Sequence, residues 1–153
     1  MRPKMISTVG LFLTCLAASF FGVANTRAAD MKLEAQLVWG TTNSTSPDPK
    51  HKPIAPDIKK KLDGLPFKWE NYFVVNRTNF AVPAKGTMRV RLSEKCEIQV
   101  KDLGNSKIEV THFGKGNEVW KGAQALSKGE IFPVLGGNAP NKTAWLMVLK
   151  RLE

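Results

Sequence analysis

The chain has 153 residues, and its 23 Lys and Arg residues against 13 Asp and Glu residues give a formal net charge of +10. A chain of this length is expected to form one domain. It contains no phosphate-binding loop, nucleophile elbow or dinucleotide fingerprint, so no motif predicts an enzyme class.

The N-terminus has the three-part layout of a secretory signal peptide. Arg2 and Lys4 precede an uncharged, largely apolar run at 5–23, and small residues follow this run. Cleavage after Ala28 or after Ala24 would suit the layout, and we favour Ala28. An N-terminal membrane anchor is the alternative, but serine, threonine and glycine dilute the run, whereas a span needs about 20 strongly apolar residues.

Removal of residues 1–28 would change the composition of the working protein. It would leave 125 residues with a net charge of +7, and Cys96 would be the single cysteine. A disulfide within one chain would then be impossible, which excludes a disulfide-stapled scaffold. About 125 residues can form a hydrophobic core without such cross-links. The sequence therefore predicts an exported protein, periplasmic or extracellular, whose mature chain has no transmembrane span.

The mature chain should begin with a strand. Apolar and polar residues alternate from Lys32 to Trp39, which is typical of a strand with one buried face, and Gly40 should end it. A proline-rich loop is expected at 41–56, because its four prolines keep the backbone extended. A short helix should follow at 56–64, with proline at its start and glycine at its end.

The rest of the chain shows strands separated by turn residues. The strands are expected at 72–77, 80–82, 88–92, 96–101, 108–113, 118–124, 131–135 and 143–152. Whether 80–82 continues the strand before it is left open. The last strand is apolar on both faces, so we expect it to be central and its Trp145, like Trp39, to lie in the core.

The clearest hairpin joins 88–92 to 96–101. Pairing Leu92 with Cys96 would place Val90 opposite Ile98 on the buried face. The same register places Arg91 opposite Glu97 and Met88 opposite Val100. Seven or eight short strands at spacings near ten residues predict a mainly antiparallel all-β fold at 29–153, a single β-sandwich or partly open barrel with one short helix near 56–64.

The layout also resembles small exported bacterial β-rich proteins of unassigned activity. The resemblance rests on an N-terminal strand, an Asp-Pro-Lys loop at 48–50, a short helix, hairpins and a closing strand pair that contains Leu135-Gly136-Gly137. The segment from Leu126 to Leu149 is similar to a hairpin of secretin pore subunits. These resemblances imply an exported β-rich domain and supply no catalytic residue.

Cysteine and histidine are the residues that most often carry site chemistry. Cys96 falls on the same face as Ile98, so we expect it to be buried as a small hydrophobic residue, rather than to form an intermolecular disulfide or act as a nucleophile. His112 also points inward, whereas His51 lies in the proline-rich loop. Neither histidine has a cysteine or carboxylate at ligand spacing beside it, so the sequence predicts no metal site and no cofactor.

A lysine cluster is the strongest functional feature. Within twelve residues it contains Lys50, Lys52, Lys59, Lys60 and Lys61. Such a cluster predicts contact with an anionic envelope polymer or lipid headgroups, through electrostatic attraction that weakens with salt. The alternative is a solvated helix face. Nucleic acid is disfavoured, because no exposed aromatic row interleaves with the lysines.

Trp120 is the tryptophan that the sequence predicts to be exposed, since Glu118 and Gly122 share its side of the strand. It could stack on a sugar or anchor an interface. The alternative is a tryptophan of the sandwich core.

We therefore expect a non-catalytic binding or accessory module of the cell envelope. Its partner would be an anionic polymer, a lipid headgroup or another envelope protein. The first alternative is a small periplasmic hydrolase whose carboxylates converge only in the fold. The second is a subunit that joins an envelope assembly by edge-strand addition.

Overall fold

The computed structural model describes residues 28–138 and 143–153, so the predicted signal peptide lies almost entirely outside the described residues. In chain order the elements are β1 (Met31–Thr41), β2 (Lys52–Pro53), α1 (Pro56–Asp63), β3 (Asn71–Val82), β4 (Thr87–Ser93), β5 (Cys96–Gly104), β6 (Lys107–Gly114), β7 (Asn117–Ala125), β8 (Ile131–Asn138) and β9 (Ala144–Arg151).

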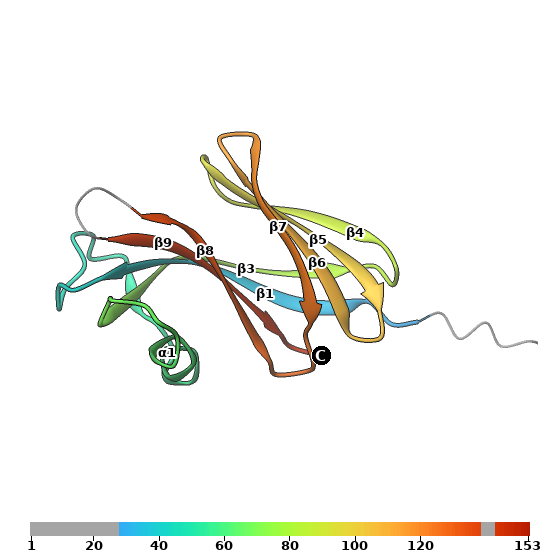
Figure 1. The fold of residues 1–153 in the computed structure, drawn as a ribbon, viewed down its shortest axis with the longest axis horizontal. Helices are drawn as coiled ribbons and strands as arrows, with labels where there is room; N and C mark the ends of the chain where they lie inside the picture. Colours follow the sequence, from blue (N-terminus) through green and yellow to red (C-terminus); the bar gives the residue numbers. More distant parts are fainter. Residues whose placement is uncertain (1–27, 139–142) are drawn as a thin grey trace, which may run out of the picture.

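The strands form two antiparallel sheets that are stacked face to face. One sheet has the order β2-β3-β1-β9-β8, and the other has the order β4-β5-β6-β7. Figure 1 shows the second sheet on one side of the first, with α1 on the opposite side. The predicted all-β fold is confirmed. Of its two expected forms the sandwich is correct, because neither sheet closes on itself within the described residues.

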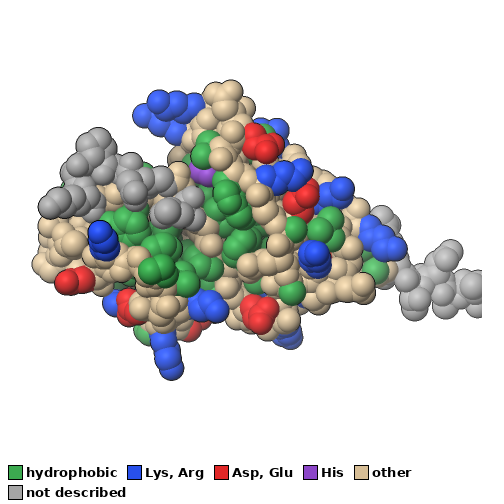
Figure 2. All heavy atoms as spheres, viewed as in Figure 1, with side chains coloured by type: hydrophobic (Ala, Val, Ile, Leu, Met, Phe, Trp, Pro, Cys, Tyr) green, Lys and Arg blue, Asp and Glu red, His purple; other side chains and the backbone are tan. Residues whose placement is uncertain are grey.

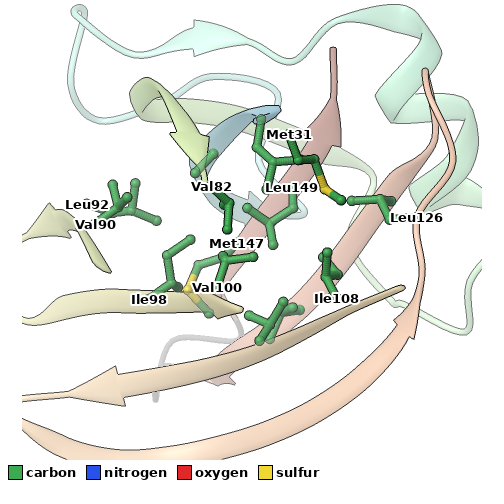
Figure 3. Close-up of a cluster of buried hydrophobic side chains, with 14 of the residues drawn as sticks. Met31, Val82, Val90, Leu92, Ile98, Val100, Ile108, Leu126, Met147 and Leu149 are labelled. Carbon is green, nitrogen blue, oxygen red and sulfur yellow. The ribbon is translucent and has the colours of Figure 1, made fainter. Parts of the chain in front are cut away.

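The larger core lies between the two sheets. Leu33, Ala35 and Leu37 of β1 point into it, together with Met147 and Leu149 of β9. From the other sheet the core receives Val90, Leu92, Ile98, Val100, Ile108 and Val110. Figure 3 shows side chains of both sheets directed toward one another in this layer. The alternation of apolar residues along each strand therefore determines which face is buried.

A smaller core lies on the outer face of the five-stranded sheet, under α1. Ile58 and Leu62 are four residues apart, so they share one side of the helix, and both are buried against Val38, Leu146 and neighbouring residues. The helix begins with proline at its N-terminal turn and is followed by Gly64 as its C-cap. This second core explains why β9 is apolar on both faces. β9 is an interior strand, paired with β1 and β8, although β1 occupies the middle of the sheet.

Several predicted strand boundaries need correction. The first strand continues past Gly40 to Thr41, and 72–77 and 80–82 belong to one strand, β3. The proline-rich loop contains β2, whose residues Lys52 and Pro53 pair with β3. A proline is tolerated there because β2 is an edge strand, where one side makes no ladder hydrogen bonds.

The β4–β5 hairpin has the predicted register over most of its length. Val90 lies opposite Ile98, and Arg91 lies opposite Glu97. The predicted pairing of Leu92 with Cys96 is wrong, because the register shifts and Ser93 pairs with Cys96. A bulge of this kind adds one residue to one strand, and it leaves Leu92 buried in the core.

Candidate functional site: a pocket between the sheets

Specific contacts join the two sheets on two sides and at one end. On one side, the Asn76 side-chain amide donates a hydrogen bond to the Leu92 carbonyl oxygen at 2.7 Å. On the other side, the rings of Trp120 and Phe132 lie 6.0 Å apart between centroids. At one end, Arg151 donates to the Leu126 carbonyl oxygen at 3.0 Å. At the opposite end, which carries the β4–β5 and β6–β7 turns, the two sheets enclose a pocket.

This wedge pocket has a volume of about 520 Å³, which lies within the range of small-molecule sites. Its walls are mainly apolar. They include Leu37, Val75, Trp145 and Met147 from the five-stranded sheet, and Cys96, His112 and Val119 from the four-stranded sheet. Figure 2 shows hydrophobic side chains gathered in the recess between the two sheets, with Lys and Arg side chains on the surrounding surface.

Two glycines line the wedge pocket at positions that have no room for a side chain. Gly136 lines the pocket at the bulge of β8, and a Cβ atom there would lie 2.8 Å from the Trp145 carbonyl oxygen. Gly114 lies opposite Cys96 in the β5–β6 ladder, and a Cβ atom there would lie 2.9 Å from a methyl group of Val119. Side chains at these positions would collide with neighbouring residues of the same sheet.

Two lysines lie at the rim of the wedge pocket. Lys95 belongs to the β4–β5 turn and Lys115 to the β6–β7 turn, and both are exposed. The Lys115 backbone N–H donates to the Lys95 carbonyl oxygen at 3.1 Å, which joins the two turns. Lys115 has a φ of 50° in the tight turn before Gly116. Within the described residues neither lysine forms an ion pair, so the rim presents two uncompensated positive charges beside an apolar interior.

The inner wall of the wedge pocket brings together a thiol, an imidazole and a thioether. Cys96 Sγ lies 3.8 Å from His112 Nε2 and 3.4 Å from Met147 Sδ. His112 is only 4% exposed, and its Nδ1 atom has no hydrogen-bond partner among the described residues. A buried imidazole whose polar contact is a sulfur atom is poorly satisfied, because neutral imidazole carries one good donor and one good acceptor.

Burial controls the charge of this cluster. It raises the pKa of the Cys96 thiol to about 11, so the thiol is uncharged at neutral pH. Burial also lowers the pKa of His112, which favours the neutral ring. Both directions follow from the cost of placing a charge among apolar side chains. The free thiol in this state is a poor nucleophile.

One sequence prediction about this region was wrong, and another is only partly met. Cys96 packs against the core as its side of the strand predicts, but it is half-buried because it also lines the wedge pocket. Trp145 was expected in the core with Trp39, but it is 40% exposed, whereas Trp39 is 8% exposed. Trp145 shares the inner face of β9 with Met147, and it is uncovered because the wedge pocket separates it from the opposite sheet. The inward position predicted for His112 is confirmed.

The predicted lysine cluster lies on the other side of the five-stranded sheet. Lys59 is paired with Asp63 at 2.8 Å, so its charge is partly compensated. Lys60 and Lys61 line a shallow surface hollow together with Asp57 and Glu130. Lys50 precedes β2 and Lys52 lies within it, on the same connection that leads to α1. The lysines of α1 therefore lie close to carboxylates. A binding role for the cluster stays a prediction.

Trp120 lies at the edge of the sandwich and is 37% exposed. Its indole folds over Gly122, where an added Cβ atom would lie 2.4 Å from the ring, and its other contact is Phe132 of β8. Trp120 therefore bridges the two sheets while one part of its ring reaches the surface. A stacking or interface role for this residue also stays a prediction.

The hydrolase alternative needs a pair of carboxyl groups with different protonation states. No acidic residue is among the described residues that line the wedge pocket. The surface hollow beside α1 contains Asp57 and Glu130, but Lys150 Nζ lies 2.6 Å from an Asp57 carboxylate oxygen and lowers the pKa of Asp57. Asp57 therefore remains ionised and lacks the raised pKa of a general acid.

Lys95, Lys115, Trp145 and Met147 were not identified as site residues from the sequence. One usable signal was present, because antiparallel hairpins place alternate turns at the same end of a sheet. The turns at 93–95 and 114–116 must therefore lie together. The sequence pattern could not predict how far apart the two sheets lie at that end, because this separation depends on how the sheets pack.

No protein-family model matches the chain, and comparisons with curated proteins and with solved structures gave no match either. Across residues 28–138 and 143–153, no helix has the length and apolar character needed to cross a membrane.

Proposed function

We propose that the protein is an exported, non-catalytic binding module of the cell envelope, and that its ligand is an amphipathic anion, a single alkyl chain with a phosphate or carboxylate head. The observation that carries this proposal is the wedge pocket, which combines an apolar interior of about 520 Å³ with two lysines at its rim. The proposal retains the expected anionic partner but moves its site from α1 to the opposite face of the sheet.

The chemistry of the wedge pocket selects this ligand class. An alkyl chain would remove water from Leu37, Val75 and neighbouring side chains, and burial of apolar surface contributes about 25 cal/mol per Å². The head group would remain at the rim, where Lys95 and Lys115 attract an anion and no acidic residue is found among the described residues of the pocket lining. A wholly polar sugar would fit poorly, because few groups of this lining could form hydrogen bonds with its hydroxyl groups.

Fluorescence titration tests the proposal, since Trp145 lines the wedge pocket and is partly exposed. The full chain is titrated with dodecyl phosphate and with uncharged dodecanol, both below the concentration at which they aggregate. We expect the phosphate to bind about tenfold more tightly than the alcohol, which corresponds to about 1.4 kcal/mol. The spectral change should largely disappear in Trp145→Phe.

Matched lysine variants locate the head group. Replacing Lys95 and Lys115 with Gln should remove the preference for the phosphate and leave dodecanol binding unchanged. Replacing Lys59, Lys60 and Lys61 with Gln keeps the wedge pocket intact and should leave both affinities unchanged. Equal affinity of the parent chain for phosphate and alcohol would contradict the proposal. A loss of phosphate binding only in the Lys59, Lys60 and Lys61 variant would favour the lysine cluster instead.

Export is tested separately by N-terminal sequencing of the protein recovered outside the cytoplasm. Cleavage after Ala28 should give a chain that begins at Ala29. Recovery of material that begins at Met1 would contradict the signal-peptide prediction.

Edge-strand addition is a second candidate, and the observation that favours it is the position of β7. This nine-residue strand pairs with β6 on one side and has no partner strand on the other among the described residues. An open edge offers backbone donors and acceptors to another chain. Replacing Val119 with proline should block such pairing. Unchanged assembly of that variant with envelope proteins would exclude β7 as the joining edge.

A further inference from the structure

Two neighbouring strands of one sheet and a distant strand of the other bring three soft or borderline donor atoms together on the wall of the wedge pocket. Cys96 is the first residue of β5, His112 belongs to β6, and Met147 comes from β9 of the other sheet. Cys96 Sγ lies 3.4 Å from Met147 Sδ and 3.8 Å from His112 Nε2. We propose that Cys96, His112 and Met147 form a binding site for a single Cu(I) ion.

The two separations that involve Cys96 Sγ are close to those between ligands of one ion. Bonds of about 2.3 Å to sulfur and about 2.0 Å to nitrogen place the ligands of a three-coordinate ion about 3.7–4.0 Å apart. The distance of 3.8 Å between Cys96 Sγ and His112 Nε2 falls in this range. The distance of 3.4 Å between the two sulfur atoms is shorter, so Met147 must move outward by about half an ångström. Methionine can do so because its side chain is unbranched and flexible.

The donor set and its surroundings select the metal. Thiolate and thioether ligands favour Cu(I), whereas magnesium and calcium require oxygen ligands, and no acidic residue lines the wedge pocket among the described residues. Charge supports the same choice. The ion takes the place of the thiol proton, which is released to water, so a monovalent cation and a thiolate give an uncharged centre. A divalent ion would leave one net positive charge in an apolar pocket, which is costly.

His112 provides an observation that is independent of the cysteine. His112 is only 4% exposed, and its Nδ1 atom, which is not the proposed ligand atom, has no hydrogen-bond partner among the described residues. Its Nε2 atom faces Cys96. Gly114, opposite Cys96 in the ladder, adds no side chain to the wall. All three donor residues line the wedge pocket, which gives the ion a route from solvent.

The Cu(I) site does not rest on the amphipathic ligand proposed above, because Lys95 and Lys115 take no part in it. Failure of one proposal therefore leaves the other in place. The lysine variants test the ligand, and variants of the three donor residues test the metal.

The test is an anaerobic competition between the full chain and a coloured Cu(I) chelator, with the metal supplied as Cu(I). The parent protein carries Cys15→Ser, so that Cys96 is the single thiol. We expect one Cu(I) per chain and a thiolate-to-copper absorption band in the ultraviolet. X-ray absorption should show two sulfur ligands and one nitrogen ligand.

Each donor has a variant and a matched control. Cys96→Ser should weaken Cu(I) binding by about 100-fold or more, and Met147→Leu and His112→Asn should each weaken it by roughly tenfold or more. Met88→Leu changes another methionine that packs against the same core, and His51→Asn changes the other histidine. Both controls should bind like the parent. Far-ultraviolet circular dichroism verifies that every variant is folded.

Two results would overturn the proposal. The first is Cu(I) binding by folded Cys96→Ser that equals binding by the parent. The second is weakened binding in Cys96→Ser with parental affinity in both Met147→Leu and His112→Asn, because that pattern describes a lone thiol rather than a three-ligand site. Should His112→Asn fail to fold, the X-ray absorption spectrum of the parent decides, since a spectrum without a nitrogen ligand would refute the site.

Discussion

The side-chain amide of Asn76 on β3 donates a hydrogen bond to the carbonyl oxygen of Leu92 on β4, and this bond joins one sheet of the sandwich to the other. It lies beside the wedge pocket, whose lining includes Val75 and Ser93, the neighbours of these two residues in the chain. The distance between the sheets at the wedge pocket is therefore held by a specific polar contact as well as by core packing.

Removal of this link should cost a modest amount of stability. Asn76→Ala is expected to lower the free energy of unfolding by about 1 kcal/mol, the typical net contribution of one hydrogen bond. Urea denaturation measures the change. Asn79→Ala is the matched control, since Asn79 is an exposed residue of the same strand, and it should stay within about 0.5 kcal/mol of the parent. Equal effects of the two variants would show that the link is unimportant.

The core between the sheets should be far more sensitive. Ile98 is fully buried, so Ile98→Ala removes methyl groups and leaves a cavity, with an expected loss of about 3 kcal/mol in the free energy of unfolding. Val119 is 57% exposed, and Val119→Ala should be nearly neutral. Thermal unfolding compares the two, and a similar decrease in Tm for both would contradict the described packing.

Gly136 should not tolerate a side chain. Its added Cβ atom would lie 2.8 Å from the backbone oxygen of Trp145, which cannot move aside as a flexible side chain could. Gly136→Ala is expected to destabilise the protein by about 1–3 kcal/mol. At Gly64 the nearest atom to an added Cβ lies 3.5 Å away, so Gly64→Ala should be neutral or slightly stabilising. If Gly136→Ala unfolds at the same urea concentration as the parent, the close approach to Trp145 is wrong.

His112 should make stability depend on pH in the acidic range. Burial lowers its pKa below the ordinary value of 6.5, so at lower pH the unfolded chain binds a proton that the folded chain does not. Its contribution is therefore present above pH 6.5 and is lost as the pH falls. Urea midpoints at pH 7.5 and pH 5.0 should differ less for His112→Leu than for the parent. A parental difference in His112→Leu would contradict this account.

Cys96 should react slowly for an electrostatic reason. Its pKa is raised from 9.0 to about 11 by burial, so at pH 8 its thiolate fraction is about 100-fold lower than in the unfolded chain. In the Cys15→Ser protein, alkylation by iodoacetamide should be slower by about that factor in the native state than in urea. Equal rates in the two states would show that the thiol is not in an apolar environment.

Most of the fold could be predicted from local patterns. The alternation at Val90 and Ile98 identified a buried face and its register, and proline and glycine marked both ends of α1. The bulge at Leu92 could not be predicted, because the shift in register depends on how the turn closes and which residues the core accepts.

Less of the candidate site could be predicted. Trp145 lies on an apolar strand, and only the divergence of the two sheets decides that its ring borders a pocket instead of the core. Cys96, His112 and Met147 have no recognisable spacing, because one pair meets across a hairpin and the other across the sandwich. Long-range packing of this kind leaves no local trace in the sequence.

The most direct test of the central claim, that the wedge pocket is the binding site, is a map of amide and indole NMR shifts during titration with dodecyl phosphate. We predict that the largest shifts occur at Cys96, His112, Val119 and Trp145, and that they saturate with one ligand per chain. Shifts confined to Lys59, Lys60 and Lys61 of α1, with none in the wedge pocket, would contradict the claim.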